Sequence, residues 1–341
     1  MDNSYIKSLQ KKPSYSQYKG YHWADYLELL CLANLDGEFS KIDTLDRLSE
    51  REDDLEEGTP EDIEEMDALD EEGFAAPSQR YKRYDHWINR IDQWFEVLKS
   101  RELRYKDNYP FTVIDNDLVL EYDENNINHK YYLFLLICSK LYLLDNATSA
   151  KFSSYYEVMS YDGLRQLLPT SFDVELFGTN ELNENALFGK GVTCLDKIKN
   201  LALVLNEDTS KSFKEESYPP NNFGDEGLDL LAYSETGDDL SSKIVILGQC
   251  ACTEDWISKQ SSSSFESWSN KIDFTTMTIN AVFIPFCFRD AVGDWFDRGK
   301  IRKSFVVDRF RLIHYLAENH NFNAEIERLI GDIILNKESV V

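Results

Sequence analysis

The sequence lacks an apolar run long enough to cross a membrane. Its best candidate, "YYLFLLICSKLYLL" at 131–144, is interrupted by Ser139 and Lys140, whereas a spanning helix needs about 18 or more apolar residues. We therefore expect a buried helix there and no membrane contact. The stretch 1–23 lacks the apolar core and cleavage site of an export signal, which leads us to expect a cytoplasmic protein.

The cysteines lack the regular spacing of a disulfide framework. Without an export signal, this scatter predicts reduced thiols. Cys250 and Cys252 form a C-x-C pair, but no second cysteine pair and no nearby histidine accompany them. A zinc site is therefore disfavoured, because zinc usually takes four such ligands.

Basic charge is scarce: the chain has 36 Lys and Arg against 62 Asp and Glu, for a formal net charge of −26. Half of this excess comes from 50–73, which holds fourteen acids and one base. Such a run repels itself and buries little, so a disordered acidic insert at about 50–78 is expected. It could instead mimic nucleic-acid phosphate in a basic groove, and the chain could then be an interaction protein that binds a basic partner.

Helical spacing predicts a helical accessory region over 1–150. Ser40 is the expected N-cap of its second helix. The predicted elements are two helices within 23–50, an aromatic-striped helix at 83–105, a hairpin at 110–123 and the apolar helix at 130–144.

Over 151–341 strands and helices alternate, which is typical of an α/β layer. We therefore predict a mixed α+β domain there. Its expected strands are 172–178, 223–233, 243–251 and 279–286, with a strand or strand-to-helix passage at 304–317. Its expected helices are 153–169, 192–206, one beginning at Thr253, and 323–335.

Two neighbouring strands each carry a polar group in an apolar context. In "FGDEGLDLLAY", Asp229 lies between Leu228 and Leu230, and "KIVILGQCA" places Gln249 at the end of the next strand. A buried charge costs several kcal/mol unless something pairs with it. A carboxylate and an amide oxygen at one sheet edge match the oxygen ligands of Mg²⁺, so we expect a magnesium site there.

The segment "GDEGLDLLAY…KIVILGQCACTEDWISK" resembles the core of the PD-(D/E)XK restriction-endonuclease-like superfamily. It most resembles a bacterial group with a Gly-Gln-Cys-Ala second motif followed by a Trp and a Lys. The resemblance implies an αβα core in which Asp229 is the first metal-binding acid. Gln249 occupies the position where the family usually has its second acid, a Glu or an Asp. The usual lysine position holds Ala251, so Lys259 is the matching candidate, and Glu157 is the candidate for the helical acid.

The chemistry that the resemblance implies is hydrolysis of DNA phosphodiester bonds with Mg²⁺ or Mn²⁺. Asp229 would anchor the ion, Gln249 would contribute its amide oxygen, and Lys259 would orient water or stabilise charge on phosphorus. Because neutral Gln249 binds Mg²⁺ more weakly than a carboxylate, further negative charge could come from Asp225, Glu226 or Glu157. Of these, Glu226 and Glu157 are the expected metal ligands, beside Asp229 and Gln249.

Structural roles for the same residues stay open. Asp229 could pair with Lys259 or Arg309, Lys259 could be an ordinary solvated lysine, and Gln249 could be a hydrogen-bonded core amide. Ala251 in place of a lysine favours a rival function, a catalytically weakened nuclease fold that serves as a scaffold or DNA-positioning subunit.

Four cations are the best candidates for nucleic-acid contact, because they directly precede a predicted strand: Arg298, Lys300, Arg302 and Lys303. They could equally flank the strand for solubility. The acidic remainder suggests that a partner subunit shares DNA binding, and the resemblance implies a bacterial anti-phage defence or restriction complex. The sequence leaves a homo-oligomer open.

Overall fold

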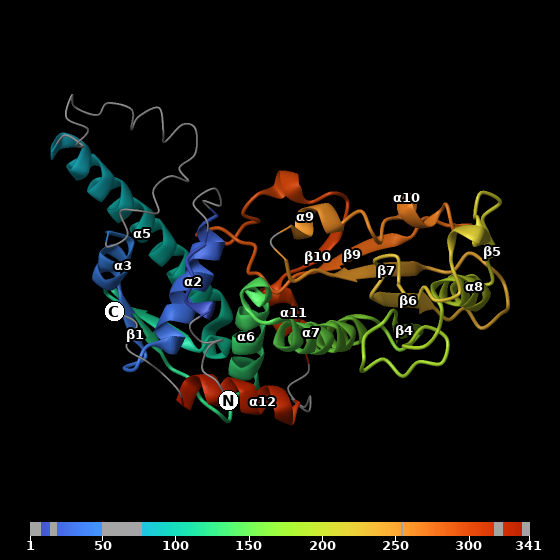
Figure 1. Cartoon of the computed structure of the whole chain (residues 1–341), viewed down its shortest axis with the longest axis horizontal. Helices are drawn as coiled ribbons and strands as arrows, with labels where there is room; N and C mark the ends of the chain where they lie inside the picture. Colours follow the sequence, from blue (N-terminus) through green and yellow to red (C-terminus); the bar gives the residue numbers. More distant parts are fainter. Residues whose placement is uncertain (1–7, 14–18, 50–76, 254, 317–322, 336–341) are drawn as a thin grey trace. The chain divides into compact units, whose positions relative to one another are not determined.

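The computed structural model of the chain describes residues 8–13, 19–49, 77–253, 255–316 and 323–335 (Figure 1). Within these ranges no helix is long and apolar enough to cross a membrane. The acidic insert falls, at 50–76, outside the described residues.

The chain forms two compact units. Unit 1 combines Met1–Ile137 with Phe288–Phe296 and Phe322–Val341, and unit 2 combines Cys138–Cys287 with Asp297–Asn321. The sequence predicted a single boundary at residue 150. Two short segments from the second half of the chain instead belong to unit 1, and local periodicity does not reveal such an exchange.

Unit 1 is mainly helical. Its helices are α2 (Gly20–Ala33), α3 (Lys41–Ser49), α5 (Pro77–Tyr105), η2 (Lys106–Asn108), α6 (Ile127–Cys138, whose last residue belongs to unit 2) and α12 (Ala324–Leu335). An antiparallel sheet has the order β1-β3-β2, with β1 at Glu38–Ser40, β2 at Phe111–Ile114 and β3 at Asp117–Leu120. The hairpin predicted at 110–123 is therefore confirmed. The Ser40 cap is confirmed too, since its hydroxyl accepts from the N–H of Asp43 at 2.9 Å.

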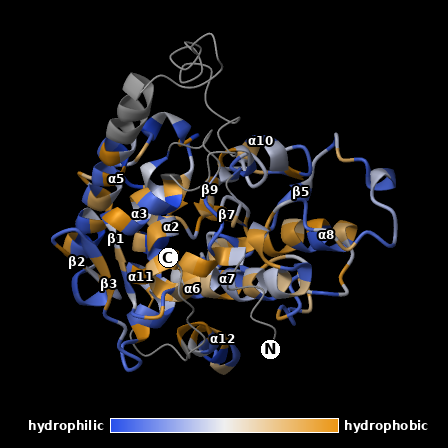
Figure 2. Cartoon of the chain, turned by 60° about the vertical axis from the view of Figure 1, so that its left-hand side comes forward, coloured by the Kyte–Doolittle hydropathy of each residue, from blue (hydrophilic) through white to orange (hydrophobic). Residues whose placement is uncertain are grey.

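The aromatic stripe of α5 is core, as its spacing predicted. Trp94 and Phe95 are buried, and Trp94 stacks on Trp23 of α2 with ring centroids 4.3 Å apart. α6 is buried along most of its length, and Figure 2 shows its hydrophobic character. The helices of unit 1 are thus held together mainly by burial of large apolar side chains.

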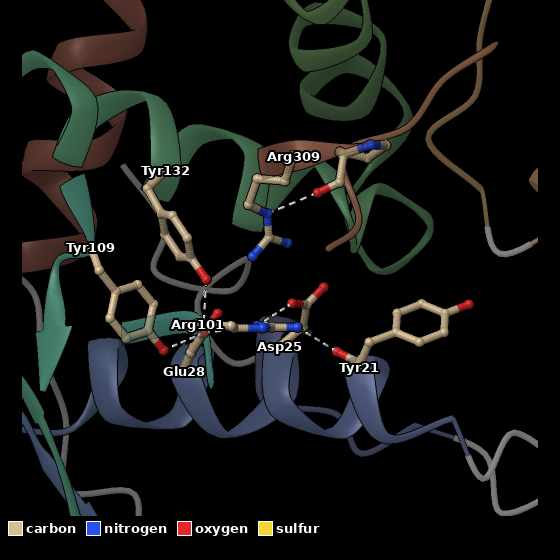
Figure 3. Close-up of polar contacts among 8 residues, drawn as sticks. Tyr21, Asp25, Glu28, Arg101, Tyr109, Tyr132 and Arg309 are labelled. Atoms are coloured by element: carbon tan, nitrogen blue, oxygen red, sulfur yellow. Dashed lines mark hydrogen bonds and ion pairs between the residues drawn. The ribbon is translucent and has the colours of Figure 1, made fainter. Parts of the chain in front are cut away.

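One buried polar cluster lies inside this core (Figure 3). Arg101 donates through Nη1 to Asp25 and to Glu28, each at 2.8 Å. Glu28 also accepts from the hydroxyls of Tyr109 at 2.7 Å and Tyr132 at 2.8 Å. Burial and the nearby Glu28 carboxylate raise the Tyr109 pKa well above its usual value, so this tyrosine stays a donor. Within this cluster, the Arg101 guanidinium and two tyrosine hydroxyls contribute to compensating two buried carboxylates.

Unit 2 contains a mixed five-stranded sheet in the order β10-β9-β7-β6-β4. β4, β6 and β7 pair antiparallel, whereas β7, β9 and β10 pair parallel. The strands are β4 (Phe172–Leu176), β6 (Leu230–Ser234), β7 (Val245–Cys250), β9 (Ile279–Phe283) and β10 (Phe305–Val307). The mixed α/β class predicted from the alternating pattern is confirmed.

Helices cover both faces of this sheet. On one face, α8 (Cys194–Leu205) and Trp268 pack against Leu231 and Leu247, and Figure 2 shows the hydrophobic character of α8. On the other face, α7 (Asn146–Leu167) packs against β4 and β7 and against α11 (Arg309–Tyr315). Gly163 of α7 allows a close helix crossing, because a Cβ there would lie 2.4 Å from the Leu312 side chain.

The smaller elements of unit 2 are two short strands and several short helices. β5 (Asp208–Thr209) pairs with β8 (Ile272–Asp273). The short helices are η3 (Leu141–Leu143), η4 (Glu215–Ser217), α9 (Trp256–Lys259), α10 (Phe265–Trp268) and η5 (Arg298–Lys300). The helix predicted to begin at Thr253 begins at Trp256, because Thr253 instead closes a turn by accepting from the Trp256 N–H at 3.0 Å.

Candidate functional site

Asp229 is fixed in the sheet by its backbone. It directly precedes β6, its N–H donates to the Gly248 carbonyl at 2.9 Å, and its carbonyl accepts from the Phe177 N–H at 2.8 Å. Its residue surface is only 8% exposed. The carboxylate is therefore held at the end of β6, beside β7, as the sequence predicted.

Two donors from β7 bind the same oxygen of this carboxylate. Oδ2 of Asp229 accepts from Gln249 Nε2 and from the Cys250 N–H, both at 2.6 Å. Among the described residues no hydrogen bond reaches Oδ1. The carboxylate is thus oriented through one oxygen and keeps the other for a further partner.

Gln249 turns its amide nitrogen, not its oxygen, to Asp229. An ionised carboxylate only accepts hydrogen bonds, so the NH₂ end must face it. The amide oxygen lies toward Gly227, where an added Cβ would be 3.0 Å away. As placed, Gln249 is the hydrogen-bonded amide that the sequence left open, and its oxygen would serve an ion bound to Asp229 only after the amide turned.

Glu157 of α7 shares the electrostatic environment of Asp229. Its Oε2 accepts from Asn180 Nδ2 at 2.7 Å. Burial raises the Glu157 pKa to about 7; the negative charge of Asp225 also raises it, and the Asn180 hydrogen bond opposes the rise. Burial, Glu157 and Asp225 likewise raise the Asp229 pKa well above its usual value. We call Glu157, Asp225 and Asp229 the carboxylate cluster.

Asp225 is held by a tight turn and by a close glycine. Its Oδ1 accepts from the Gly227 N–H at 2.9 Å. Gly178 approaches from the end of β4 with a φ of +112°, and a Cβ there would lie 2.9 Å from Asp225 Oδ2. Both glycines have a positive φ, so side chains at these two positions would be strained.

Lys259 lies within electrostatic reach of the cluster. It is the last residue of α9, and its charge lowers the pKa of Asp229 and of Cys252, opposing the effect of burial on both. Asp229 forms no ion pair with Lys259 within the described ranges. Arg309, the other partner considered for Asp229, donates its Nε to the Pro285 carbonyl at 2.9 Å.

Glu226 is directed away from the carboxylate cluster. Its φ of +56° begins a sharp turn, and its Oε2 lies 3.5 Å from Lys271 Nζ. Cys194 of α8 is the other neighbour of its carboxylate. The structure therefore brings Asp225 to the cluster but not the adjacent Glu226.

The four predicted nucleic-acid contacts lie together on 298–303, which we call the cationic loop. Each of their side chains is exposed. None forms an ion pair with a carboxylate elsewhere in the described part of the chain. These residues are Arg298, Lys300, Arg302 and Lys303.

The oxygen atoms of the carboxylate cluster suit an open site for a hard divalent ion such as Mg²⁺. They do not form a closed site in which protein side chains supply every ligand. Among the described residues, no three His, Cys, Asp or Glu side chains converge closely enough to hold a metal. Mg²⁺ needs only one or two carboxylates and takes the rest of its shell from water and substrate phosphate. Carboxylates that repel one another and a free Asp229 Oδ1 match that requirement.

Two supporting residues were not predicted. Asn180 holds Glu157, and Lys197 of α8 donates to the carbonyls of Phe223 at 2.8 Å and Gly224 at 3.3 Å. A signal for Lys197 was present, because it lies three residues after Cys194 and four before Leu201, which is the helical spacing of buried positions. Asn180 lies in a loop rich in asparagine, which indicated a turn but no partner.

Comparison with known proteins finds no match to the chain among family models, curated proteins or solved structures.

Proposed function

We propose that the chain is a metal-dependent nuclease of the PD-(D/E)XK restriction-endonuclease-like type that hydrolyses phosphodiester bonds in DNA. The carboxylate cluster is the observation that carries the proposal. Burial raises the pKa of Glu157 and of Asp229, and the nearby Asp225 carboxylate raises both further. Acids with raised pKa values are costly to keep ionised, and such groups gather at functional sites. A divalent cation would relieve their repulsion.

The order of elements supports the same proposal. α7 is followed by three antiparallel strands, β4, β6 and β7, and then by a helical crossover to the parallel strand β9. Helices cover both faces of the sheet. This arrangement is consistent with the αβα core that the resemblance implies, with α8, β5 and η4 inserted between β4 and β6. Glu157 lies on α7, Asp229 directly precedes β6 and Gln249 lies on β7.

The residues would divide the chemistry as follows. Asp229 Oδ1 and the Glu157 carboxylate would hold the ion, while the β7 donors keep Asp229 in place. A bound Mg²⁺ would lower the pKa of a bound water and offset phosphate charge. Lys259 would donate to a non-bridging phosphate oxygen and stabilise charge in the transition state. Ionised Glu157 would supply the charge that neutral Gln249 lacks.

One observation favours a second function, a nuclease-fold scaffold that positions DNA. Ala251, at the usual lysine position, is fully buried and its N–H donates to the Phe283 carbonyl at 2.9 Å. Gln249 has its nitrogen committed to Asp229. In this alternative Lys259 would bind phosphate without assisting hydrolysis.

The test compares the wild-type chain with Asp229→Asn on linear, supercoiled and single-stranded DNA, with Mg²⁺, with Mn²⁺ and with chelator. We expect metal-dependent cleavage by the wild type and none by Asp229→Asn, because Asn keeps the side chain's shape but cannot offer a charged Oδ1. Glu184→Gln, at an exposed position, is the charge-matched control. Equal cleavage by Asp229→Asn would refute the site, whereas DNA binding without any cleavage would support the scaffold.

The biological setting that the resemblance implies is a subunit of a bacterial anti-phage defence or restriction complex. This setting, with its protein partner, stays a prediction.

A further inference from the structure

Gln260 joins the cationic loop to α9. It directly follows Lys259, and its residue surface is 1% exposed. Its Nε2 donates to the Lys300 carbonyl and its Oε1 accepts from the Arg302 N–H, both at 2.9 Å. One side-chain amide thus pairs with two backbone groups of the loop, as an adjacent strand would, so the loop backbone is held next to Lys259.

Asn280 of β9 locks this contact onto the sheet. Its Nδ2 donates to the Gln260 carbonyl at 2.7 Å and to Ser304 Oγ at 2.8 Å, and its Oδ1 accepts from Ser263 Oγ at 2.7 Å. When the hydrogen bonds of a buried polar network are all formed, the network makes the segments that it connects more rigid. The sheet, α9 and the start of β10 therefore carry the loop as one rigid element.

The cations on this rigid element are left available. Four like charges within six residues repel one another, and a chain with 62 acidic residues offers many partners for them. Yet in the described part of the chain none of the four forms an ion pair. Lys303 moreover adopts a φ of +55°, a conformation that L-residues other than Asn and Asp rarely adopt. A preorganised, unpaired set of cations fits a ligand with repeated negative charge.

We propose that the cationic loop binds the sugar–phosphate backbone of a DNA strand and that Gln260 fixes the position of this contact relative to Lys259. The inference rests on the proposed function and deepens it by naming the residues that hold the DNA strand and by requiring a substrate of a certain length. The substrate is a polynucleotide long enough to reach both the loop and the carboxylate cluster, rather than a mononucleotide or a small phosphodiester.

Binding without divalent metal tests the loop separately from hydrolysis. Affinity of the full chain for a short fluorescent DNA strand and its duplex is measured against salt concentration. Each phosphate neutralised contributes about −0.7 (single strand) or −0.9 (duplex) to the slope of log K against log salt. Replacing the four loop cations by Gln is expected to reduce the steepness of that slope by about 3 to 4.

A control for position removes two exposed cations elsewhere in unit 2. Lys211→Gln combined with Lys214→Gln is expected to leave the slope at the wild-type value. Equal slopes for the loop variant and the wild type would overturn the proposal. If binding follows the prediction but no condition gives hydrolysis, the proposed function fails and the loop assignment stands.

Gln260 has its own test, the ratio of hydrolysis rates for DNA and for a small aryl phosphodiester. Gln260→Leu removes both loop bonds, and Ser304→Ala removes one link of the network and serves as the milder variant. Hydrogen exchange of β9 checks that each variant is folded. For Gln260→Leu we expect the ratio of the DNA rate to the small-substrate rate to fall about tenfold, which is the effect expected from losing a hydrogen-bond contribution of ordinary size. For Ser304→Ala we expect a smaller fall. A general structural role would lower both rates equally, and an unchanged ratio in both folded variants would overturn the coupling.

Discussion

Removing the charge of Glu157 should make the metal-free protein more stable above neutral pH. Glu157 is held in a buried position beside Asp225 and Asp229, and its pKa rises from 4.5 to about 7. Glu157→Gln keeps an oxygen that accepts the Asn180 hydrogen bond, so the change mainly removes the ionisation. The variant isolates the energetic cost of an ionised acid at this site.

The sign and size follow from proton linkage. Between pH 4.5 and about 7 the folded protein keeps a proton that the unfolded chain has lost. The wild type therefore loses stability as pH rises through this window. One pKa unit corresponds to about 1.4 kcal/mol, so Glu157→Gln should gain up to about 3 kcal/mol above pH 7 and nothing below pH 4.5.

Native-state hydrogen exchange of β6 and β7 measures the stability difference between wild type and Glu157→Gln within unit 2, independently of the stability of unit 1. Chelator is present, pH runs from 4.5 to 8, and Glu184→Gln serves as the charge-matched control. Adding Mg²⁺ should stabilise the wild type by about 2.7 kcal/mol at 100 times its dissociation constant, and the variant by less. A stability difference between wild type and variant that does not change with pH would refute the electrostatic reasoning.

Three further predictions concern single residues. Arg101→Met removes the guanidinium that donates to two buried carboxylates and should destabilise unit 1 by about 3–5 kcal/mol, seen as faster exchange of α2. Gly178→Ala adds a Cβ at a positive φ and 2.9 Å from Asp225 Oδ2. It should cost about 1–3 kcal/mol and reduce DNA hydrolysis more than DNA binding. Burial lowers the His129 pKa, so the wild type should lose stability as pH falls below about 6.5, with a steeper slope than His129→Gln in denaturant titrations.

The sequence predicted the strands that carry Asp229 and Gln249 because both are short apolar runs bounded by turn residues. It also placed Asp229 beside Gln249, since consecutive antiparallel strands put such ends together. Of the two adjacent acids it chose Glu226 as a metal ligand, whereas the structure places Asp225 beside Asp229 and turns Glu226 toward Lys271. The left-handed backbone at Glu226 and Gly227 reverses the side-chain directions, and alternation does not extend through such a turn.

Contacts between segments distant in sequence were the other limit. Gln260 looked like an ordinary helix residue, and its role depends on a loop about forty positions later, with bonds to Lys300 and Arg302. Helical periodicity describes one segment at a time, so it predicted the apolar face of α8 but not the ammonium of Lys197 within it. The basic residues of the cationic loop could be identified from the sequence alone, whereas the hydrogen bonds that hold the loop became evident only in the structure.

The division of the chain between two units constrains how the protein can be made and cut. α12 packs on α2 in unit 1, and Lys130 of α6 pairs with Glu327 of α12. On the ribosome, unit 1 therefore stays incomplete until α12 has emerged, long after unit 2 has most of its sheet. A fragment that starts at residue 151 would carry α12 without its partner helix. Expression trials that seek unit 2 alone should omit α12 and the 288–296 segment together, or keep the whole chain.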